Sequence, residues 1–272
     1  EIIGEWNPNM PLLTASTMKT ITTGTGLSLL GPYFRFETKI ATTGTIKNGT
    51  LHGDLHIIGG GDPTLGSKDT VAFKVDSIFG VWRAAIKAAG IEKINGNIIV
   101  DDRYFKREAI PDSWTWGNIG YDYGAAPSGL SFFENMQRFK LVPGKKIGDP
   151  VSITVLYPSV PEFSVQNCLK TAARRSGDKS SYYVQDISLA GRYSGTIPVD
   201  RDSIVTNNAF KFPHLGCGYE FANSLSIDDI KFKGTIVDID SMGVCNCGEV
   251  EENRRVDTSR TILVTTYSPE LW

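Results

Sequence analysis

The sequence lacks several features that would assign its class at once. Its 272 residues include 28 basic and 30 acidic side chains, a formal net charge of −2, and no long run of Lys or Arg. Without a cluster of basic residues the chain has no strong positive potential to attract a phosphate backbone, so we expect no nucleic-acid partner. The apolar runs, such as residues 98–100, are far shorter than the ~20 residues that span a bilayer. We therefore expect no transmembrane segment.

Cysteine is also scarce. Cys168, Cys217, Cys245 and Cys247 are too few for a disulfide scaffold in a chain of this length. The last three could in principle form a zinc site with His214, but their spacing fits the usual zinc motifs poorly. Ordinary buried thiols, or one disulfide from Cys217, are the alternatives. We predict no metal site.

What is present describes an ordinary folded chain. Hydrophobic residues make up 40% and charged residues 21% of the sequence, which excludes a disordered or fibrous protein. The length suggests about two domains. Residues 16–30 form a helix candidate that ends at Gly31-Pro32, and its many small residues predict close packing and burial.

The remainder of the pattern is mostly β. Residues 33–58 alternate as strands around an Asn48-Gly49 turn, and residues 76–89 have the period of an amphipathic helix. We expect a third helix over residues 214–225. Further strands are predicted at residues 94–100, 139–142, 151–156, 182–184, 197–199 and 231–239.

The candidate chemistry lies at the start of the first helix. Ser16 and Lys19 are three residues apart, so their side chains share one helical face and the amine can reach the hydroxyl. A helix N-terminus favours a developing oxyanion, and a neutral lysine amine can accept the hydroxyl proton. The same spacing at Ser176 and Lys179 has no predicted helix around it. Ser16 and Lys19 are the candidate nucleophile and base of an acyl transfer.

The residues around this pair extend the pattern along most of the chain. The segments that carry it are Pro11-Leu12-Leu13-Thr14-Ala15-Ser16-Thr17-Met18-Lys19, Gly59-Gly60-Gly61-Asp62-Pro63-Thr64-Leu65, Gly96-Asn97-Ile98-Ile99-Val100-Asp101-Asp102, Trp114-Thr115-Trp116 and Tyr123-Gly124-Ala125-Ala126-Pro127. In this order they resemble the class C low-molecular-mass penicillin-binding proteins, the D-alanyl-D-alanine carboxypeptidases/endopeptidases of peptidase family S13. The resemblance is looser after about residue 150.

The resemblance implies a mechanism. Ser16 would attack the carbonyl of the penultimate D-alanine of a peptidoglycan stem peptide, Lys19 would take the hydroxyl proton, and water would hydrolyse the acyl-enzyme. β-Lactams would acylate the same serine. No cofactor is needed, because nucleophile and base are both side chains.

Two departures from the family pattern stand out. The family completes its site with a Ser-x-Asn and a Lys-Thr-Gly motif, and neither occurs in these 272 residues. We therefore expect this chain to be the first part of a longer enzyme, or a truncated one. Where similar members often carry an acidic residue after the W-x-W, this chain has Asn118, which can accept a hydrogen bond from a substrate ammonium but lacks the charge. Anchoring of the loop is the other role open to Trp114, Trp116 and Asn118.

The expected fold class follows from the resemblance. It is α/β (α+β): a β-lactamase/transpeptidase-like serine acylase core, incomplete at its C-terminus, with a large β-rich insertion after the S-x-x-K helix. Residues 1–34 and 259–272 would belong to the catalytic domain. Residues 35–258 would form the insertion, which we predict to be two subdomains.

Three functions from different classes stay open. The first is a periplasmic or extracytoplasmic D-alanyl-D-alanine peptidase; its substrate would lie there, although residues 1–6 contain no signal peptide pattern. The second is a catalytically inactive cell-wall-binding or scaffold protein of the same family. The third is an esterase or amidase that uses Ser16 and Lys19 on another acyl substrate.

Overall fold

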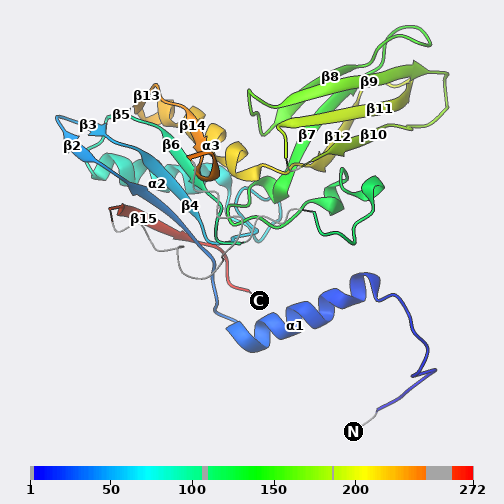
Figure 1. Cartoon of the computed structure of the whole chain (residues 1–272), viewed down its shortest axis with the longest axis horizontal. Helices are drawn as coiled ribbons and strands as arrows, with labels where there is room; N and C mark the ends of the chain where they lie inside the picture. Colours follow the sequence, from blue (N-terminus) through cyan, green and yellow to red (C-terminus); the bar gives the residue numbers. More distant parts are fainter. Residues whose placement is uncertain (1–2, 106–109, 186, 243–258, 272) are drawn as a thin grey trace. The chain divides into compact units, whose positions relative to one another are not determined.

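The computed structural model describes residues 3–105, 110–185, 187–242 and 259–271. The chain divides into two compact units, Glu1–Arg35 with Glu270–Trp272, and Phe36–Pro269. The described elements form a mixed α/β structure with several sheets and few helices, as the sequence predicts (Figure 1). Within the described part of the chain, no helix is long and apolar enough to cross a membrane.

The first unit contains the predicted N-terminal helix. A short 3-10 turn, η1 (Ala15–Thr17), continues directly into α1 (Met18–Leu30). Gly31 ends the helix with a φ of 84°, a backbone conformation that favours glycine. The prediction that this helix is buried is wrong, because none of its residues is buried. Its apolar residues do not share one face, and apart from η1 the described part of this unit has no other helix or strand to cover them.

The second unit is built on a five-stranded sheet of order β14-β6-β4-β1-β15. Its strands are β1 (Glu37–Thr42), β4 (Leu55–Gly59), β6 (Ile98–Asp101), β14 (Ile236–Asp238) and β15 (Thr261–Tyr267). β6 is parallel to both its neighbours, and all four of its residues are buried. A strand covered on both faces requires a continuous apolar run, which residues 98–100 supply.

A four-stranded sheet of order β13-β5-β3-β2 lies in the same unit. Its strands are β2 (Thr45–Lys47), β3 (Thr50–His52), β5 (Lys93–Asn95) and β13 (Lys231–Phe232). Asn48 and Gly49 both have positive φ, as the predicted hairpin turn requires. The strand predicted over residues 94–100 is two strands, β5 and β6, in different sheets. The strand is interrupted at Gly96. Only glycine fits there, because a Cβ atom would lie 2.0 Å from the carbonyl oxygen of Gly53.

Two three-stranded sheets form the middle of the sequence, drawn in green to yellow in Figure 1. One has the order β12-β7-β8 and the other β10-β11-β9. Their strands are β7 (Met136–Val142), β8 (Ser152–Tyr157), β9 (Ser164–Ala172), β10 (Ser181–Val184), β11 (Ala190–Pro198) and β12 (Ile204–Ala209). β9 and β12 were not predicted from the sequence.

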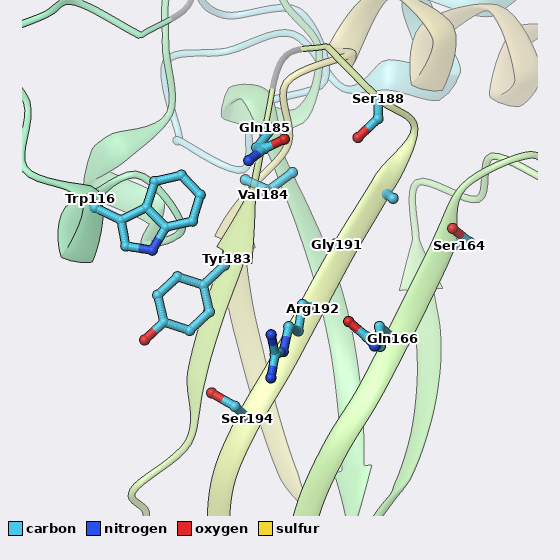
Figure 2. Close-up of a pocket in the computed structure, with 11 residues that line it drawn as sticks. Trp116, Ser164, Gln166, Tyr183, Val184, Gln185, Ser188, Gly191, Arg192 and Ser194 are labelled. Atoms are coloured by element: carbon cyan, nitrogen blue, oxygen red, sulfur yellow. The ribbon is translucent and has the colours of Figure 1, made fainter.

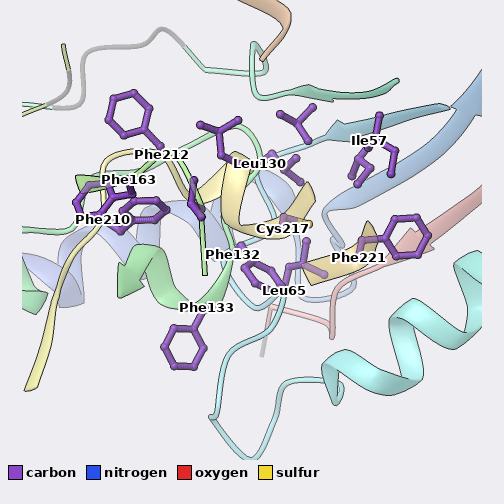
Figure 3. Close-up of a cluster of buried hydrophobic side chains, with 14 of the residues drawn as sticks. Ile57, Leu65, Leu130, Phe132, Phe133, Phe163, Phe210, Phe212, Cys217 and Phe221 are labelled. Carbon is purple, nitrogen blue, oxygen red and sulfur yellow. The ribbon is translucent and has the colours of Figure 1, made fainter. Parts of the chain in front are cut away.

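Two helices cover the five-stranded sheet. They are α2 (Val75–Ala88) and α3 (Pro213–Ser224), within one residue of the predicted starts and ends. Phe79, Trp82 and Phe221 form a ring cluster with centroids 5.2–5.3 Å apart. Phe221 and the buried thiol of Cys217 belong to the apolar cluster drawn in Figure 3. The remaining 3-10 turns are η2 (Trp116–Asn118), η3 (Asp122–Gly124), η4 (Phe133–Asn135), η5 (Leu225–Asp228) and η6 (Ile239–Met242).

Candidate active site

Ser16 and Lys19 lie together at the start of the N-terminal helix. Ser16 is in the η1 turn and Lys19 is in the first turn of α1. The Lys19 Nζ donates a hydrogen bond of 3.5 Å to the Ser16 Oγ. The two side chains predicted from spacing alone are therefore within reach of each other on one face. A hydroxyl and an amine in this arrangement have the geometry of a nucleophile and its base.

The backbone around this pair is held by local hydrogen bonds. The Thr17 N–H donates to the Thr14 carbonyl at 3.0 Å, and the Thr17 hydroxyl donates to the same oxygen. One turn further on, the Thr23 hydroxyl donates to the Lys19 carbonyl at 2.7 Å. The Ser16 N–H belongs to the first turn, where backbone donors have no acceptor within the helix. Such donors favour negative charge, and this is what an attacking serine develops on the carbonyl oxygen.

The W-x-W segment belongs to the second unit. Trp114 is half-buried, and the buried Lys211 ammonium lies 5.7 Å from its ring centroid. That ammonium also donates to the Gly124 carbonyl at 2.7 Å, so Trp114 anchors the loop. Trp116, by contrast, is 55% exposed. Of the two roles open from the sequence, these contacts favour anchoring for Trp114.

Asn118, the candidate substrate-binding residue, ends the η2 turn. It is exposed, and its Oδ1 accepts a hydrogen bond of 3.2 Å from the Tyr123 hydroxyl. Tyr123 in turn stacks on Tyr121, with ring centroids 5.2 Å apart. The amide oxygen that could receive a substrate ammonium is thus held in place by an aromatic neighbour.

A cluster that the sequence analysis missed joins Asp102, His214 and Asp238. The His214 Nδ1 is 3.2 Å from a carboxylate oxygen of Asp102, and its Nε2 is 3.1 Å from one of Asp238. Their ligand atoms lie within 4.8 Å of one another and could hold a metal ion. However, the two carboxylates face different ring nitrogens, and a single ion can bind one nitrogen of an imidazole. The arrangement is that of a buried imidazole held between two carboxylates, with a hydrogen bond between its Nε2 and Asp238.

The sequence does contain a sign of this cluster, namely carboxylates at the ends of two predicted strands. Asp102 follows the buried strand β6, Asp238 ends the neighbouring parallel strand β14, and His214 is in the first turn of α3. Carboxyl ends of parallel strands meet at one edge of a sheet, where polar side chains gather. The zinc set considered from the sequence paired His214 with cysteines instead. Cys245 and Cys247 lie outside the described residues, and Cys168 and Cys217 form no disulfide within the described part.

Comparison with known proteins agrees with this architecture. The sequence pattern of the D-Ala-D-Ala carboxypeptidase 3 (S13) family matches residues 1–242. A D-alanyl-D-alanine carboxypeptidase DacB from Haemophilus influenzae is 30% identical over 155 residues, which cover 57% of this chain and 30% of that protein. A D-alanyl-D-alanine carboxypeptidase from an Actinomadura species is 24% identical over 231 residues, which cover 83% of this chain and 41% of that protein. The chain thus spans less than half the length of these relatives.

Solved structures show the same fold. Penicillin binding protein 4 (dacB) from Haemophilus influenzae superposes with a TM-score of 0.76 at 21% identity, covering 99% of this chain and 54% of that one. The same protein in complex with a β-lactam superposes with a TM-score of 0.67 at 20% identity, covering 99% and 52%. The fold is therefore of the penicillin-binding, transpeptidase-like class. The family match covers most of the sequence, and the chain belongs to the D-Ala-D-Ala carboxypeptidase 3 (S13) family.

Proposed function

We propose that this chain is the nucleophile-bearing part of a serine D-alanyl-D-alanine carboxypeptidase/endopeptidase that acts on peptidoglycan stem peptides. The observation that carries the proposal is the Ser16–Lys19 contact at a helix start, in a chain of this family. Both curated relatives described above bear the name of this activity. Because these enzymes act on the cell wall, the site of action would be the periplasm or another extracytoplasmic space.

The reaction proceeds in two halves. The Ser16 Oγ attacks the carbonyl of the penultimate D-alanine while Lys19 accepts the hydroxyl proton, and the Ser16 N–H donates to the oxyanion. The C–N bond then breaks, the leaving amine of the terminal residue takes up the proton that Lys19 accepted, and an ester on Ser16 remains. Water attacks this ester, and the peptide leaves with a new carboxylate as Ser16 regains its proton. Neither half needs a cofactor.

The remaining parts of the proposal concern the rest of the chain. Residues 1–34 and 259–272 would belong to the catalytic domain, and residues 35–258 would be inserted as a β-rich region of two subdomains. Asn118 would accept a hydrogen bond from an ammonium group on the stem peptide. β-Lactams resemble the D-alanyl-D-alanine end, so they would acylate Ser16; a relative's structure has been solved with a β-lactam bound.

The test is intact mass after incubation with a β-lactam, on the protein produced from its complete gene. We expect the mass to increase by one drug molecule, the increase to vanish in Ser16→Ala, and D-alanine to be released from a D-alanyl-D-alanine peptide. Ser28→Ala is the matched control, because it removes an exposed hydroxyl from the same helix. An increase that persists in Ser16→Ala would contradict the assignment.

One alternative has an observation in its favour. The Ser-x-Asn and Lys-Thr-Gly motifs do not occur in these 272 residues. Lys233-Gly234-Thr235 is a superficial echo, but the Thr235 N–H and hydroxyl both donate to Asn97 Oδ1, at 3.2 and 3.1 Å, which is a structural role. If the complete gene also lacks both motifs and no acylation occurs, an inactive wall-binding or scaffold protein is the better description. Ester hydrolysis without release of D-alanine would point to an esterase or amidase.

A further inference from the structure

A second candidate site lies within the second unit, on the outer face of the β10-β11-β9 sheet. It is a cavity of about 530 Å³, within the usual range for ligand pockets. Figure 2 shows the residues that form it: Trp116 from the η2 turn stands beside Tyr183 of β10, and the polar side chains of β11 and β9 continue the surface. None of these residues takes part in the chemistry proposed for Ser16.

Strand register places a row of side chains on this face. Tyr183 pairs with Arg192 across β10 and β11, and Arg192 pairs with Gln166 across β11 and β9. Their neighbours Tyr182 and Tyr193 are buried, so the alternation of the strands turns Tyr183 and Arg192 outward. The result is a row that runs from an aromatic ring through a guanidinium to an amide.

The aromatic end of the row is fixed in place. The Trp116 and Tyr183 rings stack with centroids 5.8 Å apart and planes 16° apart, and 55% of the Trp116 surface stays exposed. The loop that carries Trp116 is tied to the sheets. Gly120 accepts a hydrogen bond of 3.1 Å from the Ala209 N–H, and its backbone packs so closely that a Cβ atom would lie 1.8 Å from the Tyr182 carbonyl oxygen. The wall is therefore formed before any ligand arrives.

The other end of the row is polar and cationic. Arg192 is exposed, and in the described part of the chain its side chain has no ion pair with an acidic residue. Ser194 and Ala190 lie two residues to either side of Arg192, so they share its face, and both line the cavity. The forked donors of an arginine match a carboxylate, and the hydroxyl and amide groups match the edge of a sugar ring.

We propose that this cavity binds the glycan of a peptidoglycan fragment. A pyranose ring would lie against the Trp116–Tyr183 wall, its hydroxyl and acetamido groups would meet Gln166 and the serines, and a carboxylate of the attached peptide would pair with Arg192. The identity of the ligand rests on the proposed function, since a stem-peptide hydrolase meets its substrate attached to a glycan strand. The cavity is then a holding site on the inserted region for the glycan part of the substrate.

The test measures binding by calorimetry on the Ser16→Ala background, so that the ligand is not hydrolysed. The probe is a soluble disaccharide–peptide prepared from peptidoglycan, and the same peptide without sugar is the comparison. We expect Trp116→Ala and Arg192→Gln each to weaken binding of the disaccharide–peptide by about tenfold or more, as truncation of a central contact does. Arg201→Ala, which removes an exposed arginine beyond the end of β11, is the matched control and should bind as the parent does.

Each outcome decides the question. If the sugar-free peptide binds with equal affinity, the cavity recognises the peptide and not the glycan, and the proposal is overturned. The proposal is also overturned if both variants bind the disaccharide–peptide as the parent does. Thermal unfolding of both variants at the parent temperature confirms that a loss of binding is local. The β-lactam test of Ser16 is read separately on the parent protein: if acylation fails while glycan binding depends on Trp116, the proposed catalysis is wrong and this site stands.

Discussion

At the scale of single residues, Asp101 shows how the second unit accommodates a buried charge. Its carboxylate accepts hydrogen bonds from the Arg103 Nε at 2.8 Å and Nη2 at 2.7 Å, and from the Arg260 Nη1 at 3.1 Å. Burial acts to raise the pKa of this carboxyl, but the hydrogen bonds and charge of Arg103, together with the hydrogen bond from Arg260, outweigh it and lower the pKa. The carboxylate therefore stabilises the fold in its charged form.

We expect Asp101→Asn to lower the free energy of unfolding by about 3 kcal/mol near neutral pH, because it leaves two arginines facing a neutral group. A pKa lowered in the folded state contributes stability above the unfolded pKa of about 3.9, and this is lost as pH falls through the folded value. The difference between the two proteins should therefore shrink below about pH 4. Urea unfolding at several pH values measures it, and a difference that grows as the pH falls would contradict the assignment.

Lys19 carries the second prediction at this scale. As the base for Ser16 it should be needed for acylation, and Lys19→Ala should slow acylation by a β-lactam roughly 10²- to 10⁴-fold, the range for a lost general base. Lys39→Ala is the comparison, because that lysine pairs with Glu37 on β1. Stopped-flow or mass-resolved acylation rates provide the measurement. A Lys19→Ala rate within a few-fold of the parent would remove Lys19 from the mechanism.

The Ser16–Lys19 contact could be predicted from the sequence and the His214 cluster could not, because the first is local and the second depends on the fold. Three residues of a helix fix the first contact by local geometry alone. The approach of Asp102, His214 and Asp238 depends on β6, β14 and α3 meeting at one sheet edge, and that pairing is set by the fold. Carboxylates at the ends of predicted strands indicate such an edge, but they do not show that His214 lies beside it.

At the scale of elements, α2 is the part that periodicity predicted best. Ile78, Phe79, Trp82 and Ile86 recur on one face, and all are buried. β9 was not predicted, since its Ser164–Ala172 sequence is largely polar and only two of its residues are buried. Its place comes from parallel pairing with β11 over the whole strand, a long-range contact without a local signature. α1 was predicted at the right residues, yet burial depends on a neighbour that the helix sequence does not specify.

The ring cluster on α2 gives a prediction for that element. Phe79 is 3% exposed and contacts the rings of Trp82, Phe132 and Phe221. Phe79→Ala should lower the free energy of unfolding by about 3–5 kcal/mol, since it opens a cavity among rigid rings. Val81 of the same helix is 47% exposed, so Val81→Ala should lower the free energy of unfolding by less than about 1 kcal/mol. Equal losses in urea unfolding would mean that this cluster does not hold the helix.

At the scale of the whole molecule, the two ends of the predicted insertion are joined through a sheet. β1 begins just after the first unit, and β15 lies in the returning segment, yet the two strands pair from Glu37–Tyr267 to Thr42–Thr261. Thr266 of β15 also accepts a hydrogen bond of 3.1 Å from the Trp82 indole of α2. The returning segment thus completes the sheet of the inserted region, whichever domain it is assigned to.

This arrangement predicts how the chain can be divided. A fragment of residues 36–269 should unfold in one cooperative transition, because it contains every described sheet and the apolar core. A fragment of residues 36–258 lacks β15, so β1 becomes an edge strand and Trp82 loses its partner. The fragment then lacks the hydrogen bonds between β1 and β15 and the packing of β15 in the sheet. It should therefore unfold at a clearly lower temperature than the longer fragment. Circular dichroism and calorimetry on the two fragments measure this. Equal unfolding temperatures would show that the segment after residue 258 adds nothing to the inserted region and serves the catalytic domain alone.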